Sequence, residues 1–205
     1  MFLRLSMKGR LMALAALALA AVLALGALAV GSNRVNQQAL GSLYGQEMDT
    51  LVRLQRIENG LLEVRFRAAA VLLEQMPITG SLNHLREMRK SLGEQWAPLA
   101  VRADTDFAAG DARQAFTQLK SNWALLGSTL GKLEGAYGNK DRSAIAVLLE
   151  DDWATLHKAF VKPLQTLIPL TQKAGADTYE GALASSRTLL GVGGAAAALG
   201  LAGLV

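Results

Sequence analysis

The chain has 205 residues, a formal net charge of +4 and no cysteine. Three of its 21 basic residues, Arg4, Lys8 and Arg10, precede the first apolar run, and the other 18 are nearly balanced by 17 acidic residues. This balance argues against a nucleic-acid-binding protein, because such proteins concentrate basic residues on one face. The absence of cysteine excludes thiol chemistry and cysteine-ligated metals.

Residues 11–31 are predicted to form a first transmembrane helix. Leu11 to Val30 carry no polar side chain, and at about 1.5 Å per residue they span roughly 30 Å, the thickness of the hydrocarbon layer. The basic residues 1–10 are then expected to stay in the cytoplasm. A cleaved signal peptide is the alternative, since Ala27-Leu28-Ala29 has the pattern of a cleavage site.

Residues 32–187 are predicted to form an all-α domain outside the cytoplasmic membrane. Apolar residues recur at spacings of three and four, which indicates helices, and no segment alternates with a period of two. Ser81 and Asp111 are the predicted N-caps of the second and third helices. Short turns favour antiparallel neighbours, and so we expect an antiparallel up-down four-helix bundle. Its helices are expected at 33–76, 81–107, 111–137 and 141–187.

The fourth predicted helix leads into a second apolar segment. Its apolar line includes Ile145, Leu149 and Trp153. Pro163 also falls on this line and is expected to bend the helix, because proline removes a backbone donor. Residues 188–205 carry no charge and are predicted to form a second transmembrane helix, cut short at the end of the sequence.

The two predicted spans set the expected location of the protein. It is expected to be a two-pass protein of the inner membrane, with residues 32–187 in the periplasm. Membrane lipid is therefore an expected partner, and nucleic acid is not.

Catalytic and metal-binding motifs are not found in the sequence. The two histidines, His84 and His157, are too few for a metal site without carboxylates, and Asp151 and Asp152 stand at unsuitable spacings from His157. No nucleophile elbow, phosphate-binding loop or zinc-protease motif occurs. We therefore expect no enzyme activity, no cofactor and no metal.

The layout of span, helical domain and span resembles the input half of a methyl-accepting chemotaxis protein, a bacterial transmembrane chemoreceptor. The residues 151–164, DDWATLHKAFVKPL, look like the fourth helix of the four-helix-bundle sensor domains in this family, and Tyr137-Gly138-Asn139 is similar to the aspartate and serine receptors. The resemblance implies signal transduction across the membrane, from an extracytoplasmic small molecule or a ligand-loaded binding protein. In the family, a cytoplasmic half coupled to a kinase and an adaptor follows the second span, and residues 1–205 do not contain it.

A parallel homodimer is expected, with the first helices and first spans at its centre. Leu51, Leu62 and Leu72 lie off the main apolar line of the first helix, and alanines recur every four residues in the first span. The same input module would also suit a sensor histidine kinase or a cyclic-dinucleotide enzyme. A membrane-anchored structural bundle without a ligand is a further alternative.

The ligand-binding candidates are Arg56, Arg65, Arg67 and Trp153. The family's aspartate sensors use three arginines on the first helix, of which Arg56 and Arg65 match the first and third, while Leu61 stands at the second. Guanidinium groups that face a dimer partner would clamp a small carboxylate, an organic acid or an amino acid.

Counting residues from the distal turns places the tryptophans at the height of these arginines. Trp96, Trp123 and Trp153 are expected level with Arg65 and Arg67, roughly 20 Å below the tip. The alternative is that the tryptophans are core and the arginines pair with Glu150, Asp151 or Asp152.

Overall fold

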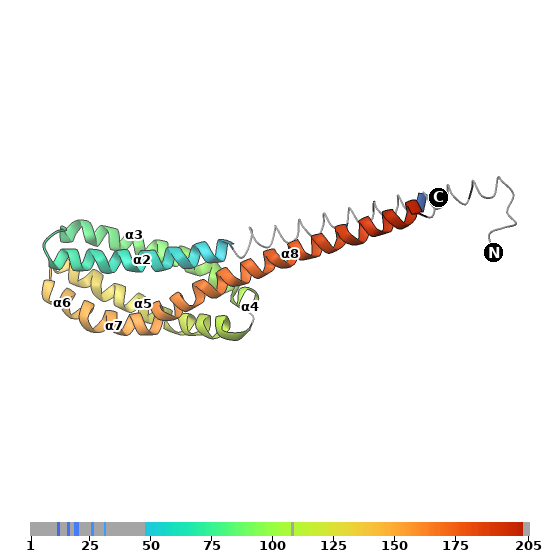
Figure 1. The fold of residues 1–205 in the computed structure, drawn as a ribbon. Coiled ribbons are helices and arrows are strands. Elements are labelled where there is room, and N and C mark those ends of the chain that lie inside the picture. The colour runs from blue at the N-terminus through green and yellow to red at the C-terminus, as the bar shows by residue number, and fades with distance from the viewer. Residues whose placement is uncertain are drawn as a thin grey trace. The chain divides into compact units, whose positions relative to one another are not determined.

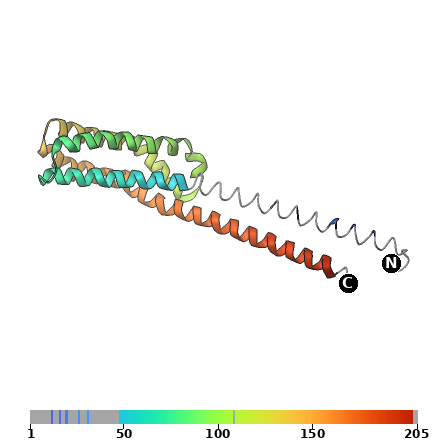
Figure 2. The same cartoon turned by 90° about the horizontal axis from the view of Figure 1, so that it is seen from above.

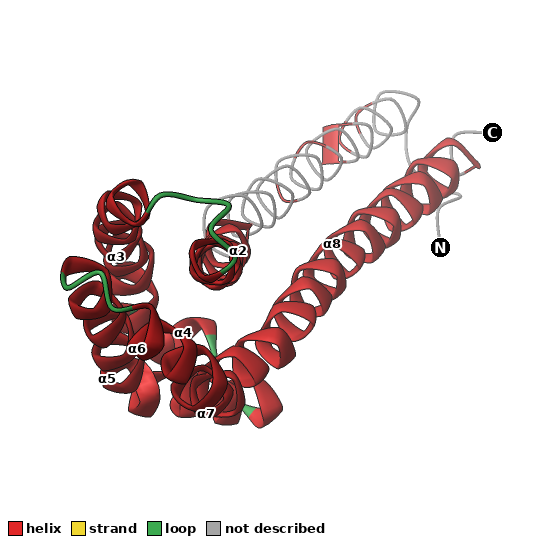
Figure 3. Ribbon diagram, turned by 90° about the vertical axis from the view of Figure 1, so that its left-hand side faces the viewer, coloured by secondary structure: helices red, strands yellow, loops and turns green. Residues whose placement is uncertain are grey.

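The computed structural model of the chain describes residues 48–107 and 109–202, together with positions 12, 16, 19, 20, 26 and 31. Within these residues the regular structure is helical and no strand occurs, which confirms the all-α prediction (Figures 1 and 3). The chain divides into two compact units, residues 46–175 and residues 1–45 with 176–205. The first unit contains the core that is described below.

Helix α2 (Met48–Leu72) ends in a hydrogen-bonded cap at the turn to α3. Glu74 has a φ of 59°, in the left-handed region, and the N–H of Gln75 donates to the carbonyl of Ala70 at 2.9 Å. This is the Schellman arrangement, which satisfies carbonyls at a helix end. Arg142 donates to the Glu74 carboxylate at 2.6 Å, so the turn is also tied to the start of the fourth helical segment.

The predicted N-caps at Ser81 and Asp111 are both wrong. Helix α3 (Ile78–Val101) begins three residues before Ser81, after Pro77, and the Ser81 side chain is buried without a hydrogen-bond partner. Pro77 lacks an N–H and has extended backbone angles, and so it suits the position before a helix. Helix α5 (Gly110–Gly138) begins after Ala109, and Asp111 lies in its first turn. There its charge interacts favourably with the helix dipole instead of capping.

The α3–α5 connection contains a short helix that the sequence did not predict. Helix α4 (Ala103–Asp106) follows a bend at Arg102, and the side chain of Phe107 after it is buried. The N–H of Arg102 still donates to the carbonyl of Pro98 at 3.2 Å. The expected second helix, to residue 107, is therefore interrupted at Arg102.

The fourth helical segment contains two π-helical turns. It comprises α6 (Arg142–Val147), η2 (Leu148–Asp152), α7 (Trp153–Leu156), η3 (His157–Val161) and α8 (Lys162–Ala202). The carboxylate of Asp141 caps α6 by accepting from the N–H of Ala144 at 3.0 Å. Segment η3 ends two residues before Pro163, which cannot donate a main-chain hydrogen bond. The irregular turn therefore stands where the proline interrupts the α-helical pattern.

The helices of residues 46–175 surround one apolar core. Helix α2 packs against α3, α3 against α5, α5 against the segment from α6 to η3, and α6 and η2 against α2 (Figures 1 and 2). Burial raises the pKa of the Tyr137 hydroxyl in this core to about 12. The largest side chains that are almost wholly buried are Phe160, Leu54, Ile57, Leu61, Leu85, Leu99, Leu119, Leu126, Ile145, Leu156, Leu164 and Leu167.

The two predicted membrane spans are only partly covered by the residues that the structure describes. The first, at 11–31, lies outside them apart from single positions. Residues 188–202 of the second are helical as the end of α8. Among the residues that the structure describes, no helix combines the length and the apolar character needed to cross a membrane.

Two glycines should respond differently to alanine. A Cβ at Gly127 would meet no heavy atom within 4 Å, whereas a Cβ at Gly60 would lie 2.7 Å from Sδ of Met88 in α3. Because alanine favours a helix over glycine by roughly 0.5–1 kcal/mol, Gly127→Ala should raise the free energy of unfolding by about that amount. Gly60→Ala should gain less or lose stability, since Met88 must move. Urea unfolding followed by circular dichroism measures both, and equal gains would contradict the close approach of α2 and α3.

Candidate functional site

The predicted arginines Arg56 and Arg65 do not converge within one chain. Both side chains are exposed on α2. They are nine residues apart, which is about two and a half turns of an α-helix, and so they leave the helix on opposite sides. A site that uses both needs groups from outside this chain.

Arg67 is held by its own helix. Its Nε lies 3.1 Å from Oε1 of Glu63, one turn earlier. The same Glu63 oxygen is 2.9 Å from Nε2 of His84 in α3, although the geometry is not that of a hydrogen bond. The alternative expectation is that Arg67 pairs with an acidic residue of the fourth segment. Asp152 is one of those residues, and it pairs with Lys132 at 2.5 Å instead.

Aromatic side chains form a stack in the core, but Trp153 is not part of it. Trp96 stacks on Trp123 with ring centroids 4.4 Å apart and on Phe116 at 5.4 Å. Phe160, and not Trp153, contributes the ring from the fourth segment, at 6.1 Å from Trp96 and 5.8 Å from Trp123. Trp153 is buried elsewhere in the core, with 5% of its surface exposed. The described packing thus gives these rings a core role.

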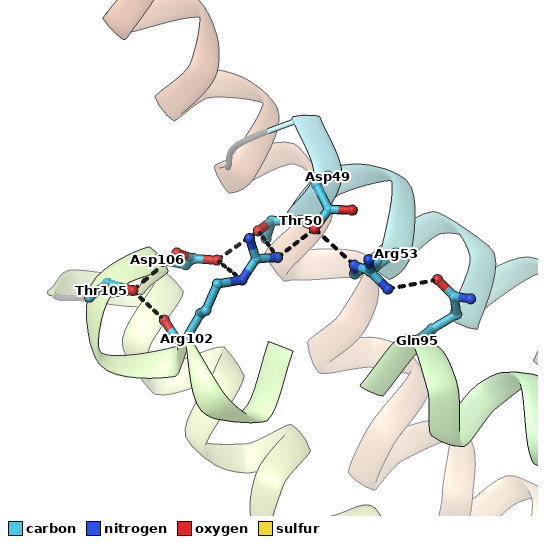
Figure 4. Close-up of polar contacts among 7 residues, drawn as sticks. All are labelled: Asp49, Thr50, Arg53, Gln95, Arg102, Thr105 and Asp106. Atoms are coloured by element: carbon cyan, nitrogen blue, oxygen red, sulfur yellow. Dashed lines mark hydrogen bonds and ion pairs between the residues drawn. The ribbon is translucent and has the colours of Figure 1, made fainter. Parts of the chain in front are cut away.

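A polar cluster that the sequence analysis missed lies where α2 begins and α3 ends (Figure 4). Nη2 of Arg102 donates to Oδ2 of Asp49 at 2.6 Å, and the same oxygen accepts from Nε of Arg53 at 2.9 Å. The hydroxyl of Thr50 donates to Oδ2 of Asp106 at 2.7 Å. Asp106 also forms an ion pair with Arg102 at 3.7 Å. Two arginines and two aspartates balance in charge, and so the cluster ties three helices without a surplus charge.

The cluster adjoins a small cavity of about 190 Å³. The hydroxyls of Thr50, Thr105 and Thr171 and the carboxylate of Asp106 provide its polar lining. The Asp106 side chain is only 8% exposed. A polar cavity of this size suits ordered water, because each molecule finds several hydrogen-bond partners. In the sequence, the pairs Asp49 with Arg53 and Arg102 with Asp106, each four residues apart, were the available indications.

Two surface grooves run beside α5, each next to a π-helical turn. The larger, of about 570 Å³, lies between the end of α5 and the α6–η2 segment, and the ion pair of Lys132 and Asp152 borders it. The smaller, of about 290 Å³, lies between the first half of α5 and the η3–α8 junction. π-Helical turns are frequent at functional sites, which makes both grooves candidates for ligands. In the described part of the chain, no group of three or more histidine, aspartate or glutamate side chains could hold a metal ion.

Comparisons with known proteins identify no relative: no protein family, no curated protein and no solved structure matches the chain.

The Asp49 carboxylate should make the stability of the chain depend on acid pH. Hydrogen bonds from Arg53, and next from Arg102, hold the pKa of Asp49 below its usual value. A lowered folded-state pKa gives stability that is present above the ordinary value of about 3.9 and is lost as pH falls through the lowered pKa. Unfolding free energies between neutral pH and about pH 3 should therefore fall less steeply for Asp49→Asn than for the parent.

Glu87→Gln, which alters an exposed carboxylate of α3 outside the cluster, is the control for that measurement. If the unfolding free energy of the parent and of Asp49→Asn falls equally between neutral pH and about pH 3, the cluster does not stabilise the Asp49 carboxylate.

Proposed function

We propose that residues 32–187 form the extracytoplasmic sensor domain of a transmembrane receptor of the methyl-accepting chemotaxis type, arranged as an antiparallel up-down four-helix bundle between two membrane spans. The packing of residues 46–175 supports the bundle, because consecutive helices contact one another and the fourth segment contacts the first. The resemblance of residues 151–164 to the family's fourth helix supports the receptor. The protein acts by binding and transmission, not by catalysis.

The continuity of α8 is the observation that carries this proposal. This helix includes the buried core residues Leu164 and Leu167, contains Pro169 in its first third, and extends to Ala202, inside the second predicted span. An α-helix transmits displacement along its axis because each turn is hydrogen-bonded to the next. Binding in the domain would thus be passed to the cytoplasmic half. Nothing in residues 1–205 restricts that half to chemotaxis, so the same input would serve a sensor histidine kinase or a cyclic-dinucleotide enzyme.

The proposed topology can be tested with single cysteines, since the chain has none of its own. Lys140→Cys, at the exposed turn before α6, should react with a membrane-impermeant thiol reagent in intact cells. Ser6→Cys, before the first predicted span, should react only after the cells are opened. Labelling of Ser6→Cys alone in intact cells would overturn the orientation.

The outer face of α2 supports the proposed homodimer. Four large apolar side chains on it, and that of Leu73 directly after its end, are 36–67% exposed, and they follow the alternating four–three spacing of a coiled-coil seam. We call this row, with the polar and small residues that complete the spacing, the outer stripe. In a parallel pair, each polar residue of the stripe meets its own copy, which fixes the register. The outer stripe comprises Met48, Val52, Gln55, Asn59, Leu62, Phe66, Ala69 and Leu73.

In such a pair, the proposed clamp of Arg56 and Arg65 would take one arginine from each copy. Arg56 and Arg65 flank the outer stripe on opposite edges, so Arg65 of one copy and Arg56 of the second lie along the same edge. Their nine-residue offset corresponds to about 14 Å along the helix axis. One small carboxylate held by both arginines would require both side chains to extend toward each other.

Disulfide formation tests the dimer and its direction. Val52→Cys, Asn59→Cys and Phe66→Cys should each give cross-linked dimers of the membrane-bound chain on mild oxidation, because a parallel pair places each position against itself. Thr117→Cys, exposed on α5, is the control and should not cross-link. Cross-linking confined to positions near Asn59 would indicate an antiparallel crossing, and no preference over Thr117→Cys would exclude the stripe as an interface.

A further inference from the structure

The smaller groove beside α5 combines two lysines with two amides. Helix α5 runs antiparallel to the η3–α8 segment (Figure 1), and the groove lies between them. Gln114 and Gln118 line it from α5, one turn apart, and Lys158 and Lys162 line it from the other side. The antiparallel course places Gln118 toward Lys158 and Gln114 toward Lys162.

The two lysines form no ion pair within the described part of the chain. Among the ion pairs that join described residues, none uses Lys158 or Lys162. Like charges four residues apart on a helix repel each other, so a bound anion would relieve that repulsion. Asp111 also lines the groove, at the end nearer to Lys162. The lining therefore carries two positive charges and one negative charge.

The walls add hydrogen-bonding groups above an apolar floor. Ala115 and Pro163 are buried beneath the groove, while the amides and the hydroxyl of Thr166 stand at its sides. The volume of about 290 Å³ is at the lower end of pockets that hold drug-sized ligands, and so it suits a smaller molecule. Pro163 at the floor closely follows the π-helical turn η3, so an occupant would touch the irregular part of the fourth segment.

We propose that this groove binds a small dicarboxylate. Lys158 and Lys162 line the same side of the groove four residues apart, so that each can meet one carboxylate of a short diacid. Each carboxylate accepts from one ammonium group and from a facing amide. The assignment of the groove rests on its own lining, and only the statement that its occupant is the sensed signal rests on the proposed function.

Calorimetric titration of the full chain in detergent tests the site, with succinate and L-aspartate as probes. Succinate should bind, and the double variant Lys158→Gln/Lys162→Gln should weaken it by on the order of tenfold or more, because two charge-assisted contacts are lost. Lys120→Gln removes the same charge from α5 outside the groove and should leave the affinity unchanged. Restoring charge with Lys158→Arg/Lys162→Arg should recover most of the binding.

The second probe examines Asp111. L-Aspartate adds an ammonium group, and if Asp111 accepts it, Asp111→Asn should weaken L-aspartate and not succinate. Weaker binding of L-aspartate than of succinate would assign the groove to simple diacids, within the same proposal. Absence of binding for both probes at millimolar concentration, or equal affinities in the parent and the double lysine variant, would overturn it. Neither result would affect the cysteine tests of topology and dimer, so the two proposals fail separately.

Discussion

The stacking of Trp96 on Trp123 and Phe116 joins α3 to α5 in the core, and the other helices pack around this contact. These rings come from α3 and α5, and Phe160 joins them from the fourth segment. Aromatic pairs contribute roughly 0.5–1.5 kcal/mol each beyond the area that they bury. Because the stack joins three parts of the chain at one level, it fixes how α5 and η3 lie against each other. The smaller groove lies on the surface between α5 and the η3–α8 junction, so its shape depends on this packing.

Apolar periodicity was sufficient to predict which residues of the first helix form the core. Leu54, Ile57, Leu61 and Val64 recur at spacings of three and four in the sequence, and all four are buried. Apolar residues that recur every three or four positions lie on one face of a helix, and this apolar face packs against the core. Periodicity does not report how a helix begins. Ser81 was assigned as an N-cap by residue type, but the helix starts three residues earlier, after Pro77, and leaves the serine inside the first turn.

The candidate sites were harder to predict, because they depend on contacts between distant segments. Asp49 and Arg102 are far apart in sequence: Asp49 lies in the first turn of α2, and Arg102 lies at the bend between α3 and α4. Their pairing results from the bend at Arg102 that starts α4, and no local pattern predicted that bend. Trp153 was placed level with Trp96 by counting residues at a uniform rise. The ring from the fourth segment in the stack is instead that of Phe160, seven residues later in the chain.

The π-helical turns change how the fourth segment relates to its sequence. A π turn closes its hydrogen bond over five residues where an α turn uses four, and so each such turn stores one additional residue in the helix. Leu148, and not the predicted Leu149, is accordingly the buried residue at η2. Downstream, Leu164 and Leu167 still face the core. Loss of one residue at either π turn would thus leave an ordinary α turn, and Leu164 and Leu167 would still face the core.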